Sequence, residues 1–189
     1  MSDQPLTGPP RAAVIAAVVL VGLLAAGVVI ASRFLPSDTA APAPTTAATP
    51  KTGPVGLVPV DAPDSGSTHC AAVLKALPAS LVSAGTTLSK LPLADPAPQG
   101  AVAWGDRIAP PVVLRCGLPK PAELTPTSAL REVSGVKWLP IVGTGSSTWF
   151  VVDRPVHIAL TLPEGVGTGP LQTVSEVVGA TLPAQPVKP

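Results

Sequence analysis

The stretch TWFVVDRPVHIALTL, residues 148–162, decides the fold class of this chain. Two runs rich in Val, Ile and Thr, 148–152 and 156–162, are separated by Asp-Arg-Pro at 153–155, a sequence that suits a turn. The pattern predicts a β-hairpin. In the second run, side-chain alternation places His157 on the face away from the core, where we expect it to be solvated.

More strands are expected before this hairpin, with a helix at each end of the series. The strands are short apolar segments broken by Pro and Gly, at 86–91, 101–104, 112–116 and 133–138. Thr68 is expected to cap a first helix that Pro78 ends, and Pro170 to open a last helix that ends near Leu182. This order predicts an α+β domain over residues 68–183, with a mainly antiparallel sheet flanked by a helix at each end.

The N-terminal third has a different composition and predicts a membrane anchor. Residues 12–32 carry no charged side chain, and at about 1.5 Å per residue such a helix spans the hydrocarbon core of a bilayer. We therefore expect a cytoplasmic tail at 1–11, a transmembrane helix at 12–32 with the lipid bilayer as its partner, and an extended Pro, Ala and Thr-rich linker at 33–67. Residues 184–189 form a short C-terminal tail. Cleavage as a signal peptide after Ala31 is the alternative.

Both cysteines lie after the predicted membrane helix. Cys70 falls in the first helix of the domain and Cys116 closes a strand. A bridge between them would close a loop of about 47 residues and contribute roughly 4 kcal/mol in the chain-entropy model. An even cysteine count in a small domain predicts a disulfide, and hence an extracytoplasmic domain on a single-pass cell-membrane protein. Two free, buried thiols are the alternative.

The composition excludes several classes of partner. The net charge is +1 and the 12 Lys and Arg are scattered, so no basic face is available for phosphates and nucleic acid is not expected as a partner. Neither His69 nor His157 has neighbours at metal-ligand spacing, and we expect no metal and no cofactor. The chain has 26 Pro, no Tyr and 3% aromatic residues, so its core must consist of aliphatic side chains.

Four side chains are candidates for binding a ligand, namely Trp104, Asp106, Arg115 and Arg154. The hypothesis is that Arg115 or Arg154, with Trp104, binds an anionic or carbohydrate envelope ligand through guanidinium hydrogen bonds and indole stacking. Asp106 is expected to pair with Arg115, and Asp153 with Arg154. In the structural alternative, Asp106 caps a turn, Arg115 satisfies buried carbonyls and Trp104 fills the core.

Two glycine-rich segments resemble ligand-binding loops only in part. Residues 165–170, GVGTGP, follow a strand and open a helix, as phosphate loops do, but no second strand or acidic partner follows. We interpret this segment as a loop that caps the last helix through Thr168, and residues 143–147 as a hairpin loop.

No set of catalytic side chains has a recognisable spacing. We therefore expect a non-enzymatic module that binds or organises an envelope protein or a glycan at the cell surface. The alternative is an envelope hydrolase or transferase acting on cell-wall material, for which two carboxylates of the domain would have to converge in a cleft. The domain acids are Asp95, Asp106, Glu123, Glu132, Asp153, Glu164 and Glu176.

Three segments are similar to hallmark stretches of a known family: AWGD at 103–106, VLRCGLP at 113–119 and VVDRPV at 151–156. In these stretches the chain resembles actinobacterial membrane proteins of the domain-of-unknown-function family 3515, and the resemblance covers roughly residues 68–183. It implies the same anchored architecture and brings no activity, cofactor or catalytic residue. The chain departs from the family at residues 107–109, where the resemblance implies a tighter Trp-Gly-Asp-Pro-Pro connection.

Overall fold

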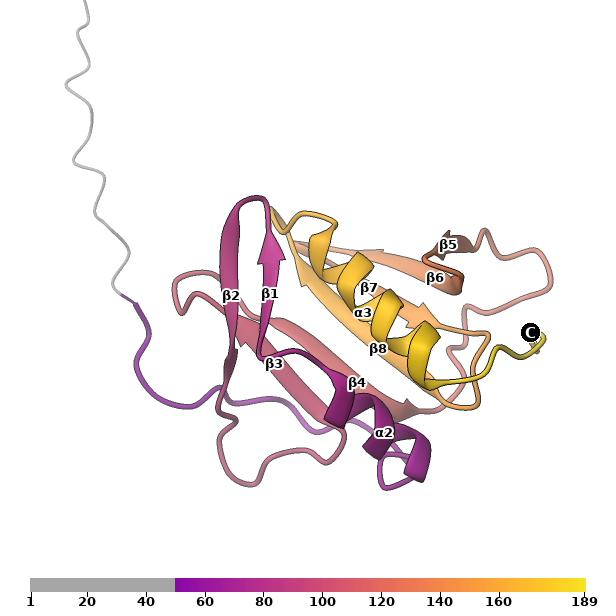
Figure 1. Ribbon diagram of the computed structural model, residues 1–189, viewed down its shortest axis with the longest axis horizontal. Coiled ribbons are helices and arrows are strands. Elements are labelled where there is room, and N and C mark those ends of the chain that lie inside the picture. The colour runs from indigo at the N-terminus through magenta and orange to yellow at the C-terminus, as the bar shows by residue number, and fades with distance from the viewer. Residues whose placement is uncertain (1–49) are drawn as a thin grey trace, which may run out of the picture. The chain divides into compact units, whose positions relative to one another are not determined.

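A computed structural model of the protein describes residues 50–189. The predicted tail, the predicted membrane helix at 12–32 and the first part of the predicted linker lie outside the described residues. Within residues 50–189, no helix has the length and hydropathy that crossing a membrane requires. The described residues have the predicted α+β fold, an antiparallel sheet of eight strands with two helices (Figure 1).

Each strand of the sheet is antiparallel to its neighbours, in the order β1-β2-β3-β4-β8-β7-β6-β5. The strands are β1 (Ser80–Ser83), β2 (Thr86–Leu91), β3 (Ala101–Gly105), β4 (Val112–Leu118), β5 (Arg131–Val133), β6 (Val136–Gly143), β7 (Ser146–Val151) and β8 (His157–Pro163). Helix α2 (Thr68–Ala76) precedes them and helix α3 (Gly169–Thr181) follows them. Both helices lie on the side of the sheet that faces the viewer in Figure 1, the front face.

The predicted hairpin at 148–162 is confirmed and lies near the middle of the sheet. Strands β7 and β8 pair with Thr148 opposite Thr161, and the hydroxyl oxygens of these two residues are 3.0 Å apart. Strand β8 also pairs with β4, so one antiparallel pair joins the two halves of the sheet. The connection from Val151 to His157 is longer than a tight turn, and its residues Asp153 and Arg154 are buried.

Two edge strands were not predicted, and the reason is the same for both. The expected single strand at 133–138 is wrong, because the chain reverses at Ser134-Gly135 between β5 and β6, with φ of 47° and 73°. Strand β1 reverses into β2 through Ala84-Gly85, with φ of 46° and 81°. Two consecutive residues at positive φ form the preferred two-residue hairpin turn. The usual sequence signal for this turn is Asn-Gly or Asp-Gly. Here the first position is Ala or Ser, so the sequence did not indicate either turn.

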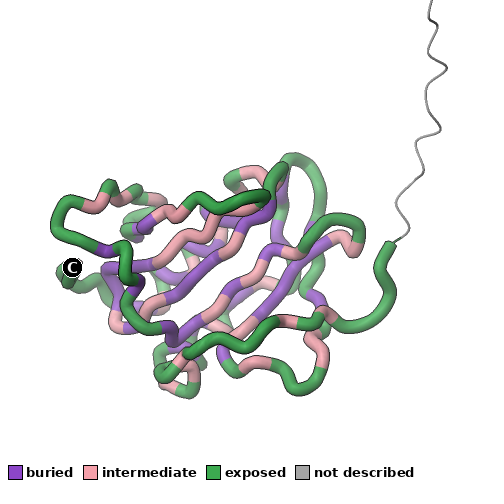
Figure 2. The backbone as a smooth tube through the Cα atoms, turned by 180° about the vertical axis from the view of Figure 1, so that it is seen from behind, coloured by how far each residue is buried: buried purple, intermediate pink, exposed green. Residues whose placement is uncertain are grey.

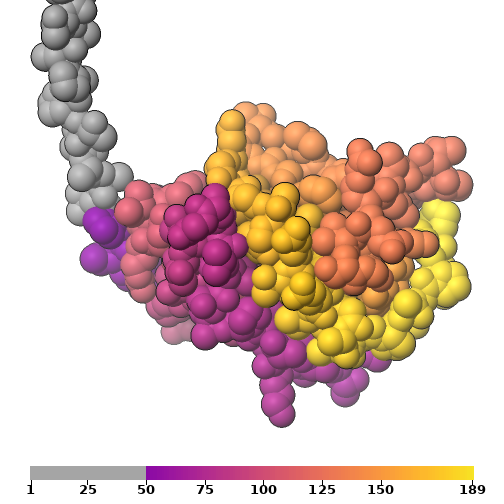
Figure 3. Space-filling model, turned by 45° about the horizontal axis from the view of Figure 1, so that its top comes forward, coloured from indigo at the N-terminus to yellow at the C-terminus, as the bar shows by residue number. Residues whose placement is uncertain are grey.

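The main core lies between the front face and the two helices. Helix α3 contacts β1 at one edge of the sheet and β5 and β6 near the other, and it lies between these two regions (Figures 1 and 3). Trp104 and Trp138 are both 0% exposed in this core. The Trp138 indole N–H donates to the Ser175 hydroxyl over 2.9 Å, and the Trp104 indole N–H donates to the Pro78 carbonyl over 3.0 Å. Two large aromatic side chains are thus buried with their polar atoms paired.

The predicted disulfide between Cys70 and Cys116 is present and joins α2 to β4. Both cysteines are 0% exposed. The helix carrying Cys70 begins one residue earlier than expected, because the Ser67 hydroxyl, not Thr68, caps it by accepting a hydrogen bond from the Cys70 N–H over 3.2 Å. The bridge therefore fixes the start of α2 on the front face of the sheet.

Residues 51–64, assigned to the linker from sequence, lie along the opposite face of the sheet, the back face, which Figure 2 shows. We call this segment the strap. The Val55 N–H donates to the Pro92 carbonyl over 2.8 Å, and the Val55 carbonyl accepts from the Ala94 N–H over 2.9 Å. Further along, the Asp64 N–H donates to the Gly117 carbonyl over 3.0 Å. A proline-rich extended chain cannot satisfy its own backbone groups, and here the sheet and its loops supply the partners.

Candidate functional site

Two arginines on the domain fasten the strap. The Arg115 guanidinium, on β4, donates to the Val58 carbonyl over 2.8 Å. The Arg107 guanidinium, in the loop between β3 and β4, donates to the Gly53 carbonyl over 3.0 Å, and the Arg107 carbonyl accepts from the Lys51 N–H over 2.7 Å. These contacts hold the strap at Lys51, Gly53 and Val58.

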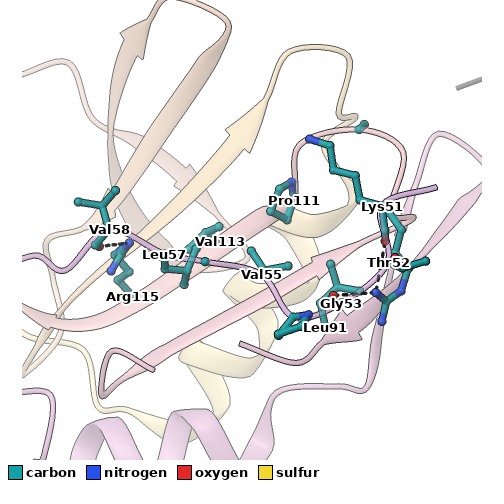
Figure 4. A pocket seen from close by; sticks show the side chains of 14 residues that line it. Lys51, Thr52, Gly53, Val55, Leu57, Val58, Leu91, Pro111, Val113 and Arg115 are labelled. Atoms are coloured by element: carbon teal, nitrogen blue, oxygen red, sulfur yellow. Dashed lines mark hydrogen bonds between the residues drawn. The ribbon is translucent and has the colours of Figure 1, made fainter. Parts of the chain in front are cut away.

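A groove of about 790 Å³ lies between the strap and the back face. Figure 4 shows Lys51 at one end of it and Arg115 at the other. Its walls are largely apolar and come from the strap and from strands β2 and β4 with the loops beside them, at residues 51–58, Leu91, Arg107, Ala109, Pro111, Val113 and Arg115. The lining thus holds three cationic side chains and no carboxylate, which favours an anionic occupant.

Asp106 orders the loop that presents Arg107 and does not pair with Arg115 as predicted. Its carboxylate accepts hydrogen bonds from the Ile108 N–H over 2.9 Å and the Ala109 N–H over 3.0 Å. The bonds from Ala109 and Ile108 hold the pKa of the Asp106 carboxyl below its ordinary value. Asp106 therefore caps a turn, as the structural alternative expected.

Arg115 is the best placed of the four predicted site residues. It is partly exposed and lines the strap groove, and partial burial lowers the pKa of its guanidinium from a value so high that the group stays cationic at neutral pH. Its bond to the strap uses one terminal nitrogen, and a guanidinium has five N–H donors.

Trp104 and Arg154 lie inside the protein. The Trp104 indole is fully buried, so the expected stacking with a ligand does not fit its position. The predicted pairing of Arg154 with Asp153 is present over 2.8 Å, with both side chains at most 6% exposed. Arg154 also donates to the Gly135 carbonyl over 2.9 Å, and so ties the β7–β8 connection to the turn between β5 and β6. This arginine has a structural role.

Two further grooves flank other parts of the sheet. One, of about 600 Å³, adjoins the strap groove on the back face and shares Arg115 with it; its lining includes Asp61, Lys120, Glu123 and Phe150. The other, of about 490 Å³, lies beside Trp149 at the tip of the β6–β7 hairpin. No two of the seven domain acids line the same one of these three grooves.

The glycine-rich segment before α3 is occupied by contacts with the sheet. The Gly167 N–H donates to the Ser83 hydroxyl over 3.0 Å, which fastens the segment to β1. Thr168 stands at the helix start without the side-chain hydrogen bond that we expected of a cap. The segment at 143–147 contains the turn between β6 and β7, as predicted.

The histidines differ in their surroundings. His157 is half-buried and not solvated as expected; burial lowers the pKa of its imidazole, while a hydrogen bond with Leu118 and the nearby Asp64 act in the opposite direction. His69 is exposed. Among the described residues, no three His, Cys, Asp or Glu side chains are grouped so that they could hold a metal ion.

The comparison with known families gives one result. The family model described as "Protein of unknown function (DUF3515)" matches residues 13–187. The chain belongs to this family. No curated protein and no solved structure matches the chain. The DUF3515 match begins well before residue 68, where the sequence resemblance was placed, and therefore includes the strap.

Sequence reasoning missed Lys51, Arg107 and Trp149 as site residues in this DUF3515 protein. Lys51 was assigned to the linker, and Arg107 was seen only as a departure from the family pattern. Trp149 was counted as a strand residue. The available signal for Trp149 was its position directly after the polar glycine-rich turn GTGSST.

Proposed function

We propose that this protein is a membrane-anchored, extracytoplasmic binding module of an actinobacterial cell envelope, without enzymatic activity. We further propose that its strap groove binds the phosphodiester group of an envelope ligand. The observation that supports this class of ligand is the composition of the groove lining. It is mainly apolar, it includes the cationic side chains of Lys51, Arg107 and Arg115, and it contains no carboxylate.

The chemistry of the three cations fits a phosphodiester. A guanidinium forms parallel, charge-assisted hydrogen bonds with phosphate oxygens, and these bonds are about twice as strong as neutral ones. The apolar side chains of Val55, Leu57 and Val113 line the same groove and would contact the carbon atoms of the ligand backbone. Phosphodiesters occur in an envelope as phospholipid headgroups and as repeating units of wall polymers, and both sources share this chemistry.

Binding is tested with two probes and four forms of the full-length chain. The probes are phosphatidylglycerol vesicles and a soluble oligomer of glycerol phosphate; the forms are wild type, Lys51→Gln, Arg115→Gln and the control Lys75→Gln, which changes an exposed lysine of α2 on the front face. We expect Lys51→Gln and Arg115→Gln to weaken binding about tenfold each and the control to leave it unchanged. Because the predicted anchor can itself enter vesicles, the probe whose binding Lys51→Gln and Arg115→Gln weaken identifies the source of the phosphodiester.

Two results would count against the proposed ligand. One is equal affinity in wild type and the two groove variants; the other is the absence of binding of both probes at low ionic strength, where electrostatic attraction is strongest. Fluorescence of the buried Trp104 and Trp138 reports whether Arg115→Gln keeps its fold after losing the bond to the strap.

The proposed location rests on the charge-free segment at 12–32 and on the buried disulfide, which persists in oxidising compartments. Because both native cysteines are buried, the reporter is a new thiol at the exposed position Thr127, introduced as Thr127→Cys. A membrane-impermeant maleimide should label this thiol in intact cells, with the unmodified chain as background. Labelling only after lysis would place the domain in the cytoplasm and remove the location from the proposal.

The alternative function, an envelope hydrolase or transferase, has one observation in its favour. Asp61 and Glu123 line the same groove on the back face, and both are exposed. A glycosidase acid needs a raised carboxyl pKa, usually obtained by burial, which exposed carboxylates lack. Release of soluble fragments from wall material by the full-length chain, abolished by Glu123→Gln, would replace the binding proposal with this one.

A further inference from the structure

The groove beside Trp149 is unlike the strap groove in position and charge. It lies on the front side of the sheet beyond the start of α3, between the β6–β7 turn and the loop that leads into this helix. Its lining residues are Val142, Gly143, Gly145, Ser146, Ser147, Trp149, residues 162–168 and Leu171. They include no Lys, Arg or His and one carboxylate, that of Glu164. Such a lining disfavours an anionic occupant.

Trp149 differs from the other two tryptophans of the chain. Trp104 and Trp138 are 0% exposed, whereas Trp149 is partly exposed and lines a groove. One part of its indole packs against the front core, which fixes the ring in place. Its N–H donates to the Ser147 hydroxyl over 3.1 Å. The ring therefore has its polar atom satisfied within the protein and offers carbon atoms to the groove.

Polar groups and open space surround this ring. The hydroxyl of Ser147, which accepts from the indole, shares the groove lining with Thr168 and Glu164. At Gly145 and Gly165, a side chain would meet no heavy atom within 4 Å, so both glycines leave the rim of the groove open. The volume of about 490 Å³ falls within the usual range for small-ligand sites.

We propose that this groove binds a neutral glycan, with one sugar ring stacked on Trp149. A pyranose presents a face of C–H groups, which packs on indole carbon atoms, and a rim of hydroxyl groups, which need donors and acceptors. The hydroxyls of Ser147 and Thr168 supply both, and Glu164 accepts from sugar hydroxyls. A purely apolar ligand would leave these polar groups without partners, and an anionic one would face an uncompensated carboxylate.

This inference does not rest on the proposed function. The strap groove is on the back face and takes its charge from Lys51, Arg107 and Arg115, none of which lines the Trp149 groove. Each site can therefore be lost without the other, and a glycan and a phosphodiester should not compete.

The test uses the fluorescence of the full-length chain. Acrylamide quenches exposed indoles, and in the described structure Trp149 is the accessible one of the three tryptophans. The probes are neutral tetrasaccharides of N-acetylglucosamine, glucose and mannose. With at least one of them we expect saturable protection from quenching. Trp149→Leu keeps an apolar side chain against the core but lacks the accessible indole, so its affinity is compared with that of wild type by isothermal titration calorimetry. The affinity should fall about tenfold.

The control is Phe150→Leu, which makes a similar truncation at the next residue of β7. Phe150 lies on the back face, so this variant should bind the probe within about twofold of wild type. Binding by Trp149→Leu as tight as wild type would overturn the proposal, as would absence of protection with all three probes. If Trp149→Leu fails to fold, Thr168→Val serves in its place. It removes the Thr168 hydroxyl from the groove, and this hydroxyl makes no capping hydrogen bond at the start of α3. Unchanged affinity in this variant would count against the site.

Discussion

Breaking the disulfide should cost this domain about 4 kcal/mol of stability. Cys70 and Cys116 are 46 positions apart in sequence, and closing a loop of this length restricts the unfolded chain by roughly that free energy. Since folded domains are stable by about 5–15 kcal/mol, the bridge supplies a large share. Replacing either cysteine by Ala breaks the bridge, and each replacement also removes one buried sulfur atom.

A double-mutant cycle separates the bridge from the burial of the sulfur atoms. We expect Cys70→Ala and Cys116→Ala each to lose the loop contribution in full, so the double variant should lose much less than the sum of the two. The difference, the coupling free energy, should be about 4 kcal/mol. Urea-induced unfolding of the full-length chain, followed by the fluorescence of the buried Trp104 and Trp138, measures all four forms.

A coupling free energy below about 1 kcal/mol would refute this reasoning. It would mean that the unfolded chain already keeps the two segments close together, or that α2 is held on the sheet mainly by its apolar contacts. Unfolding in the presence of a reductant, applied to wild type alone, provides a check, because it removes the bridge without removing either sulfur atom.

Three further predictions concern single positions. Gly117→Ala should destabilise by at least about 2 kcal/mol more than Gly85→Ala in urea unfolding. Both glycines have positive φ (86° and 81°), but the backbone of Asp64 and Ser65, at the end of the strap, occupies the space of a side chain at Gly117. Equal losses would mean that the end of the strap is not held there. Arg154→Met should lower the free energy of unfolding by about 3–5 kcal/mol, because it leaves the buried Asp153 carboxylate unpaired. Adding Asp153→Leu should restore part of this free energy, and no restoration would contradict the electrostatic explanation. Burial lowers the pKa of the His157 imidazole below its ordinary value of 6.5, so this group contributes stability that is complete above pH 6.5 and is lost as the pH falls below that value. In thermal melts from about pH 8 to about pH 5, the loss of stability should be smaller in His157→Gln than in wild type. Identical profiles would exclude this residue as the cause.

Much of the sheet could be predicted because its strands carry local signals. The runs at 101–104 and 112–116 are mainly apolar, the run at 86–91 begins with two β-branched residues, and Pro or Gly lies close to the ends of all three. Strands β1 and β5 lack such signals, since they are short and polar on one side. Both strands contact α3, and these contacts form only when the whole domain is assembled.

The candidate sites were predictable only at Arg115. It was named from its residue type and its position next to Cys116, and in the structure it lines the strap groove. Trp104 was a candidate by residue type. In a chain with 3% aromatic residues, however, a tryptophan can equally serve to fill the core, and Trp104 does so. Trp149 is partly exposed because it lies beside the start of α3, where the helix no longer covers the sheet.

By itself, the sequence determined the α+β class, the central hairpin and the cysteine pairing, and it predicts the membrane anchor at 12–32. These follow from composition and short-range periodicity, which depend on neighbours along the chain. Only the tertiary structure decided that the strap lies against the back face, that Arg107 and Arg115 hold it there, and that Trp149 lines a groove. The two arginine contacts join residues more than fifty positions apart, and their geometry is set by how the strands are ordered in space.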